Sequence, residues 1–153
     1  MARTGAPGDI VRIDFDADRH TYGVLLADPY VAVYDLPGAG DLPDPADLLA
    51  SRILFIVAVY DRALARDWPV VGRVPPDSQL PAVPEFFMQD MFNPQSCKII
   101  DVEGNVRQVP PEQCAGLERA AVWEAGHVAE RIRDHYAGRP NPDLESMKLQ
   151  LPQ

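Results

Sequence analysis

Carboxylates that lie close together in the sequence are the residues here whose types and spacing could do chemistry. Asp14 is two residues from Asp16, and Glu85 is five residues from Asp90. Two carboxylates whose environments separate their pKa values can act as the acid and the base of a glycoside hydrolase. A chain with 23 Asp and Glu residues offers such pairs by chance, however. A solvated acidic face is the simpler explanation, and a carboxylate-dependent hydrolase is the minor alternative.

Histidine and cysteine could bind a metal or act as nucleophiles, but their spacing does not favour either role. His127 and His135 are eight residues apart on a predicted helix, whereas two zinc ligands on one helix are usually four positions apart. Cys97 and Cys114 have no neighbouring cysteine, which indicates two free thiols. The sequence contains no nucleophile elbow and no glycine-rich phosphate loop. We therefore expect no catalytic residue, no metal and no cofactor.

The charge of the chain restricts its partners. The 153 residues include 14 Lys and Arg against 23 Asp and Glu, which gives a formal net charge of −9. Proteins that bind a phosphate backbone need a cationic surface, so this charge argues against nucleic acid and favours a basic partner. The longest apolar stretch, residues 53–60, is far shorter than the roughly 20 residues that span a membrane, and the N-terminus has no apolar signal core. We expect a cytoplasmic protein that binds no membrane.

Apolar runs that end at an aspartate predict the strands that must position these residues. The tetrapeptide Ala-Val-Tyr-Asp occurs at residues 32–35 and again at 58–61, each time at the end of an apolar run. Alternating residues at 9–27 predict an antiparallel hairpin, and the unbroken apolar run 53–59 predicts a central strand. Further strands are predicted at 30–36, 68–74, 85–90, 97–101 and 105–109.

The C-terminal third of the chain predicts a helix that packs on this sheet. Val128, Ile132 and Tyr136 recur at four-residue steps, so residues 125–137 form an amphipathic helix, which Gly138 ends. The resulting fold class is α+β, with a mainly antiparallel, strongly bent sheet or partly open barrel and the helix packed on it.

The length of the chain fits one domain, because single cores commonly comprise on the order of 100 to 200 residues. We expect this domain at residues 1–138. Residues 139–153 lack strong periodicity and predict a flexible or loosely docked C-terminal tail.

Aromatic and acidic side chains supply candidate contacts for a partner. Trp68 and Trp123 are candidates because tryptophan is enriched among interface hot spots, although core packing explains them more simply. Tyr60 and Asp61 end a predicted strand, where they could form a polar binding rim. The loop after residue 37 contains closely spaced acids that could meet a cationic partner. These acids are Asp41, Asp44 and Asp47.

Short segments in a fixed order make the chain resemble a known family. The more distinctive segments are Gly-Leu-Glu-Arg-Ala-Ala-Val-Trp at residues 116–123 and Gln89-Asp90. On the whole set, which runs from about residue 8 to residue 132, the chain resembles immunity protein family 26. The other segments lie at residues 8–13, 22–25, 54–60, 68–72 and 87–90.

The resemblance implies a small cytoplasmic bacterial protein that is encoded beside a polymorphic toxin and neutralises it by binding. It transfers no catalytic residue. An acidic domain suits a stoichiometric inhibitor of a basic, nuclease-like toxin. A small-molecule or peptide-binding β module is the alternative, and a deep apolar pocket would favour it. The hypothesised toxin-binding residues are Asp41, Asp44, Asp47, Tyr60, Asp61, Trp68, Gln89, Asp90 and Trp123.

Overall fold

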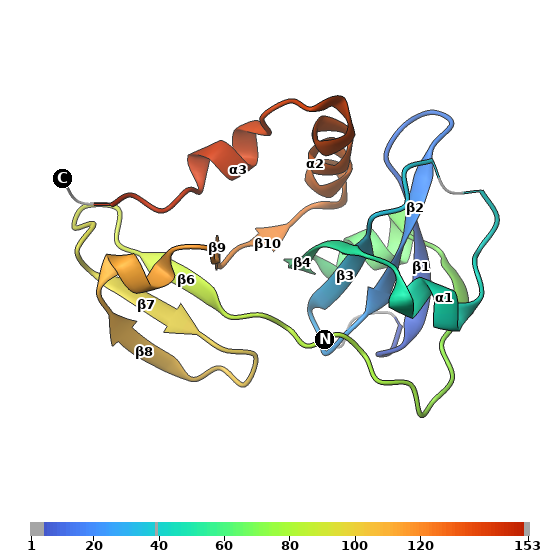
Figure 1. Cartoon of the computed structure of the whole chain (residues 1–153), viewed down its shortest axis with the longest axis horizontal. Helices are drawn as coiled ribbons and strands as arrows, with labels where there is room; N and C mark the ends of the chain where they lie inside the picture. Colours follow the sequence, from blue (N-terminus) through green and yellow to red (C-terminus); the bar gives the residue numbers. More distant parts are fainter. Residues whose placement is uncertain (1–4, 39, 152–153) are drawn as a thin grey trace. The chain divides into compact units, whose positions relative to one another are not determined.

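A computed structural model describes residues 5–38 and 40–151 of the chain. Within these residues, contacts define two compact units, each with its own β-sheet (Figure 1). The first unit comprises the chain through Ala82 together with Val122–Asn141, and the second comprises Val83–Ala121 together with the chain from Pro142. The predicted α+β class is confirmed. The sequence analysis also predicted a single domain at residues 1–138 and a tail at 139–153. Both stay predictions.

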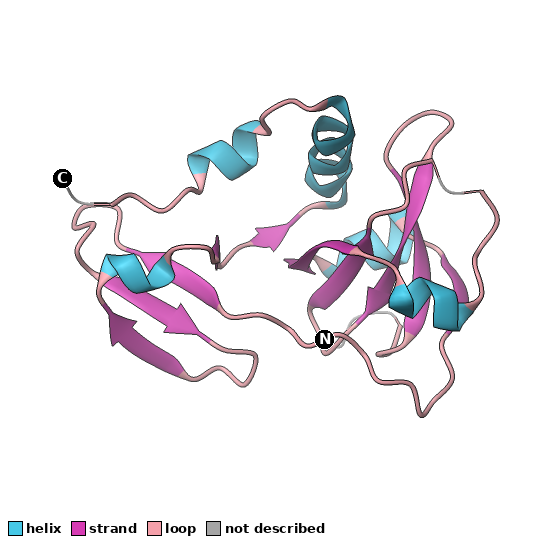
Figure 2. Ribbon diagram, in the orientation of Figure 1, coloured by secondary structure: helices cyan, strands magenta, loops and turns pink. Residues whose placement is uncertain are grey.

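The sheet of the first unit has six strands and is mainly antiparallel (Figure 2). Within this sheet, β10 and β4 at one edge form the parallel pair, and the other neighbouring strands are antiparallel. Apolar residues alternate with charged ones along β1, and the hairpin register pairs Arg12 with Tyr22 and Asp14 with His20. These four side chains therefore share one face. In spatial order the strands are β10 (Val122–Trp123), β4 (Ile53–Val59), β3 (Tyr30–Tyr34), β2 (His20–Leu25), β1 (Asp9–Asp14) and β5 (Val70–Arg73).

Strand β4, predicted to be central, is paired on both of its edges. Its neighbours are β3, which is antiparallel, and the two-residue strand β10, which forms the edge of the sheet. The apolar run continues to the end of β4 because β10 and its following helix cover this side of the unit. The predicted edge position of β5 agrees with the structure.

Helix α2 (Ala125–Ala137) has the predicted bounds and packs on this sheet. Val128 and Ile132 are fully buried, as the four-residue spacing requires. Gly138 ends the helix with a φ of 69°, a conformation that glycine adopts without a steric penalty. Two shorter helices of this unit are α1 (Pro45–Ala50) and the π-helical turn η1 (Ala63–Asp67).

The second unit is built on a four-stranded sheet that the sequence predicted only in part. The predicted hairpin is formed by β7 and β8, whereas β6 and β9 make a parallel pair. A single 3-10 turn follows β8. In spatial order the strands are β8 (Val106–Val109), β7 (Cys97–Ile100), β6 (Phe86–Gln89) and β9 (Glu118–Arg119), and the helices are η2 (Pro111–Cys114) and α3 (Pro142–Ser146).

The C-terminal residues contact the sheet of the second unit. The amide of Gln89 donates from Nε2 to the carbonyl oxygen of Gln150 at 2.6 Å and accepts at Oε1 from the Gln150 backbone N–H at 2.9 Å. The Nε of Arg119 donates to the carbonyl oxygen of Met147 at 3.1 Å. Leu149 packs against the buried cluster of this unit, which consists of Phe87, Cys97, Ile99, Val109 and Cys114.

Candidate partner-binding surface

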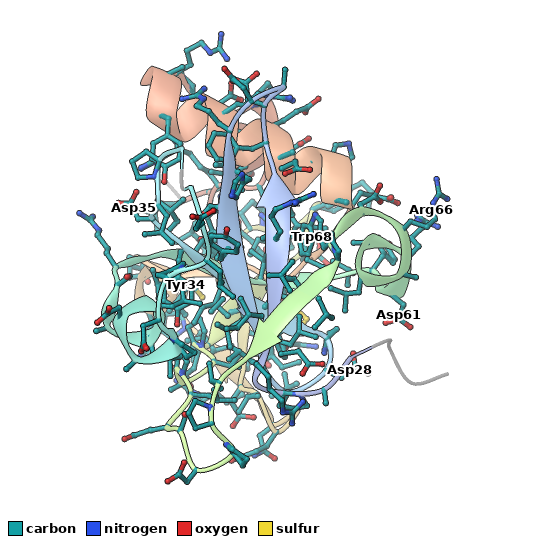
Figure 3. All side chains as sticks on the ribbon, turned by 90° about the vertical axis from the view of Figure 1, so that its right-hand side faces the viewer. Asp28, Tyr34, Asp35, Asp61, Arg66 and Trp68 are labelled. Carbon is teal, nitrogen blue, oxygen red and sulfur yellow. The ribbon has the colours of Figure 1, made fainter. Side chains whose placement is uncertain are left out.

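The two repeated tetrapeptides lie at opposite ends of adjacent antiparallel strands and in different environments. The side chain of Tyr34, at the end of β3, is fully buried, and its hydroxyl has no hydrogen-bond partner among the described residues. Burial raises the pKa of Tyr34. Tyr60, after β4, is 43% exposed. In Figure 3, Asp61 lies at the outer side of the molecule beside η1, whereas Tyr34 and Trp68 lie among the strands.

The corner after β4 presents Tyr60 and Asp61 on a rigid support. The Tyr60 backbone N–H donates to the carbonyl oxygen of Trp123 at 3.0 Å, which ties the corner to β10. The Arg62 guanidinium lies 5.0 Å from the centroid of the Tyr60 ring and forms two hydrogen bonds with the Glu124 carboxylate. These hydrogen bonds lower the pKa of Glu124. Arg62 thus compensates Glu124, while Asp61 stays exposed without a cation among the described residues.

The acidic loop and α1 use their three aspartates differently. Asp44 caps α1, because its Oδ1 accepts a hydrogen bond from the Ala46 backbone N–H at 3.0 Å. Asp47 lies in the first helical turn, where a negative charge is favourable. Asp41 is exposed, and its charge adds to the burial that raises the pKa of Tyr22. Within the part of the chain that the structure describes, Asp44 is therefore the one member of the three whose carboxylate accepts a hydrogen bond.

A shallow depression of about 260 Å³ lies beside this loop. Its walls are mostly apolar, and Asp41 contributes the charged group. A binding site for a drug-sized molecule encloses most of the ligand, and this open hollow does not. The residues that line it are Leu36, Pro37, Asp41 and Pro43.

Both tryptophans of the hypothesised contact set lie in the core of the first unit. Trp68 is 2% exposed and Trp123 is 5% exposed. The Arg131 guanidinium lies 5.1 Å from the Trp123 ring and 3.8 Å from the Phe55 ring, which holds the cation between two aromatic groups. The structural explanation of the tryptophans therefore fits their positions.

The side chains of Gln89 and Asp90, in the second unit, are used within the chain. Besides its bonds to Gln150, Gln89 donates from Nε2 to the carbonyl oxygen of Pro94 at 2.9 Å. Asp90 Oδ1 accepts hydrogen bonds from the backbone N–H groups of Phe92 and Asn93, each at 2.8 Å. Both residues thus support the loop between β6 and β7.

That loop carries two exposed residues that the sequence reasoning missed. Met91 is 87% exposed and Phe92 is 95% exposed. The sequence does contain a pattern that predicts their exposure. Asp90 before the apolar pair and Asn93-Pro94 after it are residues typical of turns, and turns lie at the surface. The sequence prediction rests on the charge of Asp90 and does not include the apolar pair.

In each pair of carboxylates considered for hydrolysis, at least one is paired with an arginine. Arg19 hydrogen-bonds Asp16 at 2.8 Å and lowers its pKa, and Arg107 does the same for Glu85 at 2.8 Å. A general acid needs the opposite shift. The alternative of a hydrolase gains no support from these pairs.

Histidine, cysteine and acidic side chains of residues 5–38 and 40–151 form no group of three or more that could hold a metal ion. Cys97 and Cys114 are both buried and free. Burial, and next the neighbouring Cys97 thiol, raise the pKa of Cys114. No helix within the described residues is both long enough and apolar enough to cross a membrane.

A comparison with known protein families shows which family the chain belongs to. The sequence model of the family immunity protein 26 matches residues 6–98, which is more than half of the sequence. The chain belongs to the immunity protein 26 family. The part that matches immunity protein 26 includes the acidic loop, the corner after β4 and the loop between β6 and β7, whereas α2 lies beyond it. No curated protein and no solved structure matches the chain.

Proposed function

We propose that this protein binds a cognate polymorphic toxin domain in the cytoplasm and neutralises it by stoichiometric occlusion, without turning over a substrate. Membership of the immunity protein 26 family, on residues 6–98, is the observation that carries the proposal. The arginine-paired carboxylates described above agree with a role in binding, because they are poorly suited to general acid catalysis.

Charge supports a basic, nuclease-like toxin as the partner. Several exposed acidic residues of the first unit form no ion pair with a cation among the described residues. They give this unit an exposed negative surface. Such a surface accelerates encounter with a positively charged cleft and repels nucleic acid. Exposed acids of this kind are Asp18, Asp28, Asp41, Asp44, Asp47, Asp61, Asp67, Asp77 and Glu130.

The test uses the toxin domain encoded beside the gene of this protein. Co-expression should restore bacterial growth, and titration of the purified toxin domain should abolish its activity at one equivalent of this chain. Complete inactivation by a small fraction of an equivalent would indicate catalysis and would contradict occlusion. A lack of both rescue and binding would remove toxin neutralisation as the function.

The acidic loop can be tested separately with substitutions that remove charge and keep shape. We expect the triple variant Asp41→Asn, Asp44→Asn and Asp47→Asn to bind about tenfold more weakly, because three rim charges are each worth up to about 1 kcal/mol and tenfold corresponds to about 1.4 kcal/mol. Asparagine at position 44 still caps α1. The salt dependence of binding should become flatter.

The matched control is Asp77→Asn, a single exposed acid in the connector between β5 and β6. It should leave the affinity within about twofold. If the triple variant keeps both the affinity and the salt dependence of the unaltered chain, the acidic loop does not contact the toxin.

A further inference from the structure

The loop between β6 and β7 exposes two large apolar side chains next to each other. Met91 is 87% exposed and Phe92 is 95% exposed. The next most exposed large hydrophobic side chain among the described residues, Leu151, is 55% exposed. Single exposed apolar residues are common on protein surfaces, but an adjacent aromatic and methionine that are almost wholly in water are not explained by packing within the chain.

The backbone under these side chains is held in one conformation. Two hydrogen bonds to the Asp90 carboxylate fix the N–H groups of Phe92 and Asn93. Backbone hydrogen bonds from Asp90 to Ser96 at 3.0 Å and from Ser96 to Asn93 at 2.9 Å close the loop. Gln89 binds the carbonyl oxygen of Pro94 from within the sheet. A loop ordered in advance loses less conformational entropy when it binds.

The chemistry of the loop selects an apolar partner surface. Its one acidic residue, Asp90, uses Oδ1 to accept from two backbone N–H groups, and residues 90–96 include no cationic side chain. Exposed polar side chains of Asn93 and Gln95 flank the apolar pair. An aromatic anchor with a polar rim is the usual composition of an interface hot spot.

The family match indicates which partner this is. The match ends at Lys98, so within the second unit it covers β6, this loop and the beginning of β7, and it leaves out β8, η2, β9 and α3. We propose that Met91 and Phe92 insert into an apolar pocket of the toxin domain, and that Gln89 and Asp90 are positioning residues for this contact. The inference rests on the proposed function and adds the part of the surface that would anchor the complex.

The first experiment measures the affinity of the loop variants for the toxin domain encoded beside the gene. Met91→Ser with Phe92→Ser should weaken binding at least tenfold, mainly through faster dissociation, and should leave the thermal midpoint unchanged because both side chains are in water. The matched control is Val106→Ser, which removes a half-exposed apolar side chain from β8 of the same unit. Affinity of the double variant within twofold of the unaltered chain would overturn the inference.

A second pair of variants separates positioning from direct charge contact. Asp90→Asn retains an oxygen that accepts from Phe92 and Asn93, so it should bind as the unaltered chain does. Asp90→Ala frees the loop and should bind more weakly although the apolar pair is intact. If both variants weaken binding equally, the charge of Asp90 itself contacts the partner and the positioning role is wrong.

Sedimentation of the unaltered chain tests the other occupant, a second copy of this protein. We expect a monomer at micromolar concentration. A dimer that the double variant abolishes would assign the apolar pair to self-association and overturn the toxin contact.

If the unaltered chain does not bind the toxin domain at all, the proposed function fails together with this inference. If the unaltered chain binds the toxin domain and the double variant binds it equally well, the inference alone fails.

Discussion

The Tyr136 hydroxyl donates a 2.7 Å hydrogen bond to the Asp35 carboxylate, which joins α2 to the end of β3 across 101 residues of sequence. The Tyr136 ring also lies 5.5 Å from the Phe15 ring, centroid to centroid. Tyr136→Phe keeps the ring and removes the hydrogen bond. We expect the free energy of unfolding to fall by about 1 to 3 kcal/mol in urea, the usual range for a bond to a charged group.

The same residue makes the stability sensitive to alkali. Burial, followed by the hydrogen bond to Asp35, raises the pKa of Tyr136 above its ordinary value of 10.0. A group whose pKa is higher in the folded state stabilises the fold below its unfolded pKa and loses this effect as the pH rises through the folded pKa. The unaltered chain should therefore have a larger free energy of unfolding than Tyr136→Phe at pH 8. This difference between the two proteins should shrink as the pH rises above 10.

Tyr34 provides the matched control. Its buried hydroxyl has no partner among the described residues, so Tyr34→Phe removes a desolvated polar group without breaking a hydrogen bond. The variant should be as stable as the unaltered chain or more stable. A loss as large as that of Tyr136→Phe would show that the Tyr34 hydroxyl has a partner.

Arg131 lies close to the rings of Phe55 and Trp123, so a lysine at this position should lower the stability. Its guanidinium lies 3.8 Å from the Phe55 ring centroid, and the side chain is 8% exposed. Arg131→Lys loses the planar contact and should cost about 1 to 2 kcal/mol in urea unfolding followed by tryptophan fluorescence. Arg66→Lys, at an exposed position within η1, should change stability by less than about 0.5 kcal/mol.

Two glycines should respond to alanine with opposite signs. A Cβ on Gly23 would lie 3.1 Å from the Ala32 carbonyl oxygen and 3.1 Å from Ile13 Cδ1, within the close-packed sheet. Gly23→Ala should cost about 1 to 3 kcal/mol. Gly126, in α2, has no atom within 4 Å of such a Cβ, and Gly126→Ala should stabilise by up to about 1 kcal/mol. Thermal unfolding of both variants checks the pair.

The turn between β7 and β8 should weaken in acid. The Asn105 backbone N–H, with further bonds from its side chain and from the Glu103 N–H, lowers the pKa of Asp101 below its ordinary 3.8. A lowered pKa stabilises the fold above the unfolded pKa, and this effect is lost as the pH falls through the folded pKa. The protection factors of the hairpin amides, which compare their exchange with that of unfolded peptide at the same pH, should fall below about pH 4 in the unaltered chain and less so in Asp101→Asn.

The two cysteines report on opening of the second unit. Both side chains are fully buried, and burial raises the pKa of Cys114. Alkylation in the native state should be more than a hundredfold slower than in denaturant, which requires only about 2.8 kcal/mol of opening free energy. Mass spectrometry of the labelled chain measures this ratio. Equal rates in both conditions would contradict the buried positions.

Local sequence signals predicted local elements well. The bounds of α2 follow from the spacing of Val128, Ile132 and Tyr136 and from Gly138, all of which lie within one segment. The hairpins also follow from neighbouring residues. The parallel pairs β4 with β10 and β6 with β9 were not predicted, because each joins a short strand to a distant one and has no pattern of its own. Hence the division of strands between two sheets was not foreseen.

The candidate site shows the same limit. Net charge and the acidic loop could be read from composition, but the use of a carboxylate depends on which N–H groups surround it. Asp44 and Asp90 have the same formal charge as Asp41, yet both accept backbone hydrogen bonds. The burial of Trp68 and the exposure of Phe92 likewise depend on tertiary packing, which residue type alone does not reveal.

Strand β10 joins its sheet from a point far along the chain, after all four strands described in the second unit have been synthesised. A ribosome releases the polypeptide from its N-terminus, so a nascent chain that stops at residue 121 has β4 with one unsatisfied edge of backbone N–H and C=O groups. Such an edge is a template for intermolecular strand pairing. The partly synthesised protein should therefore be the form that chaperones must shield, and translation speed through the codons for β10 and α2 should influence its yield.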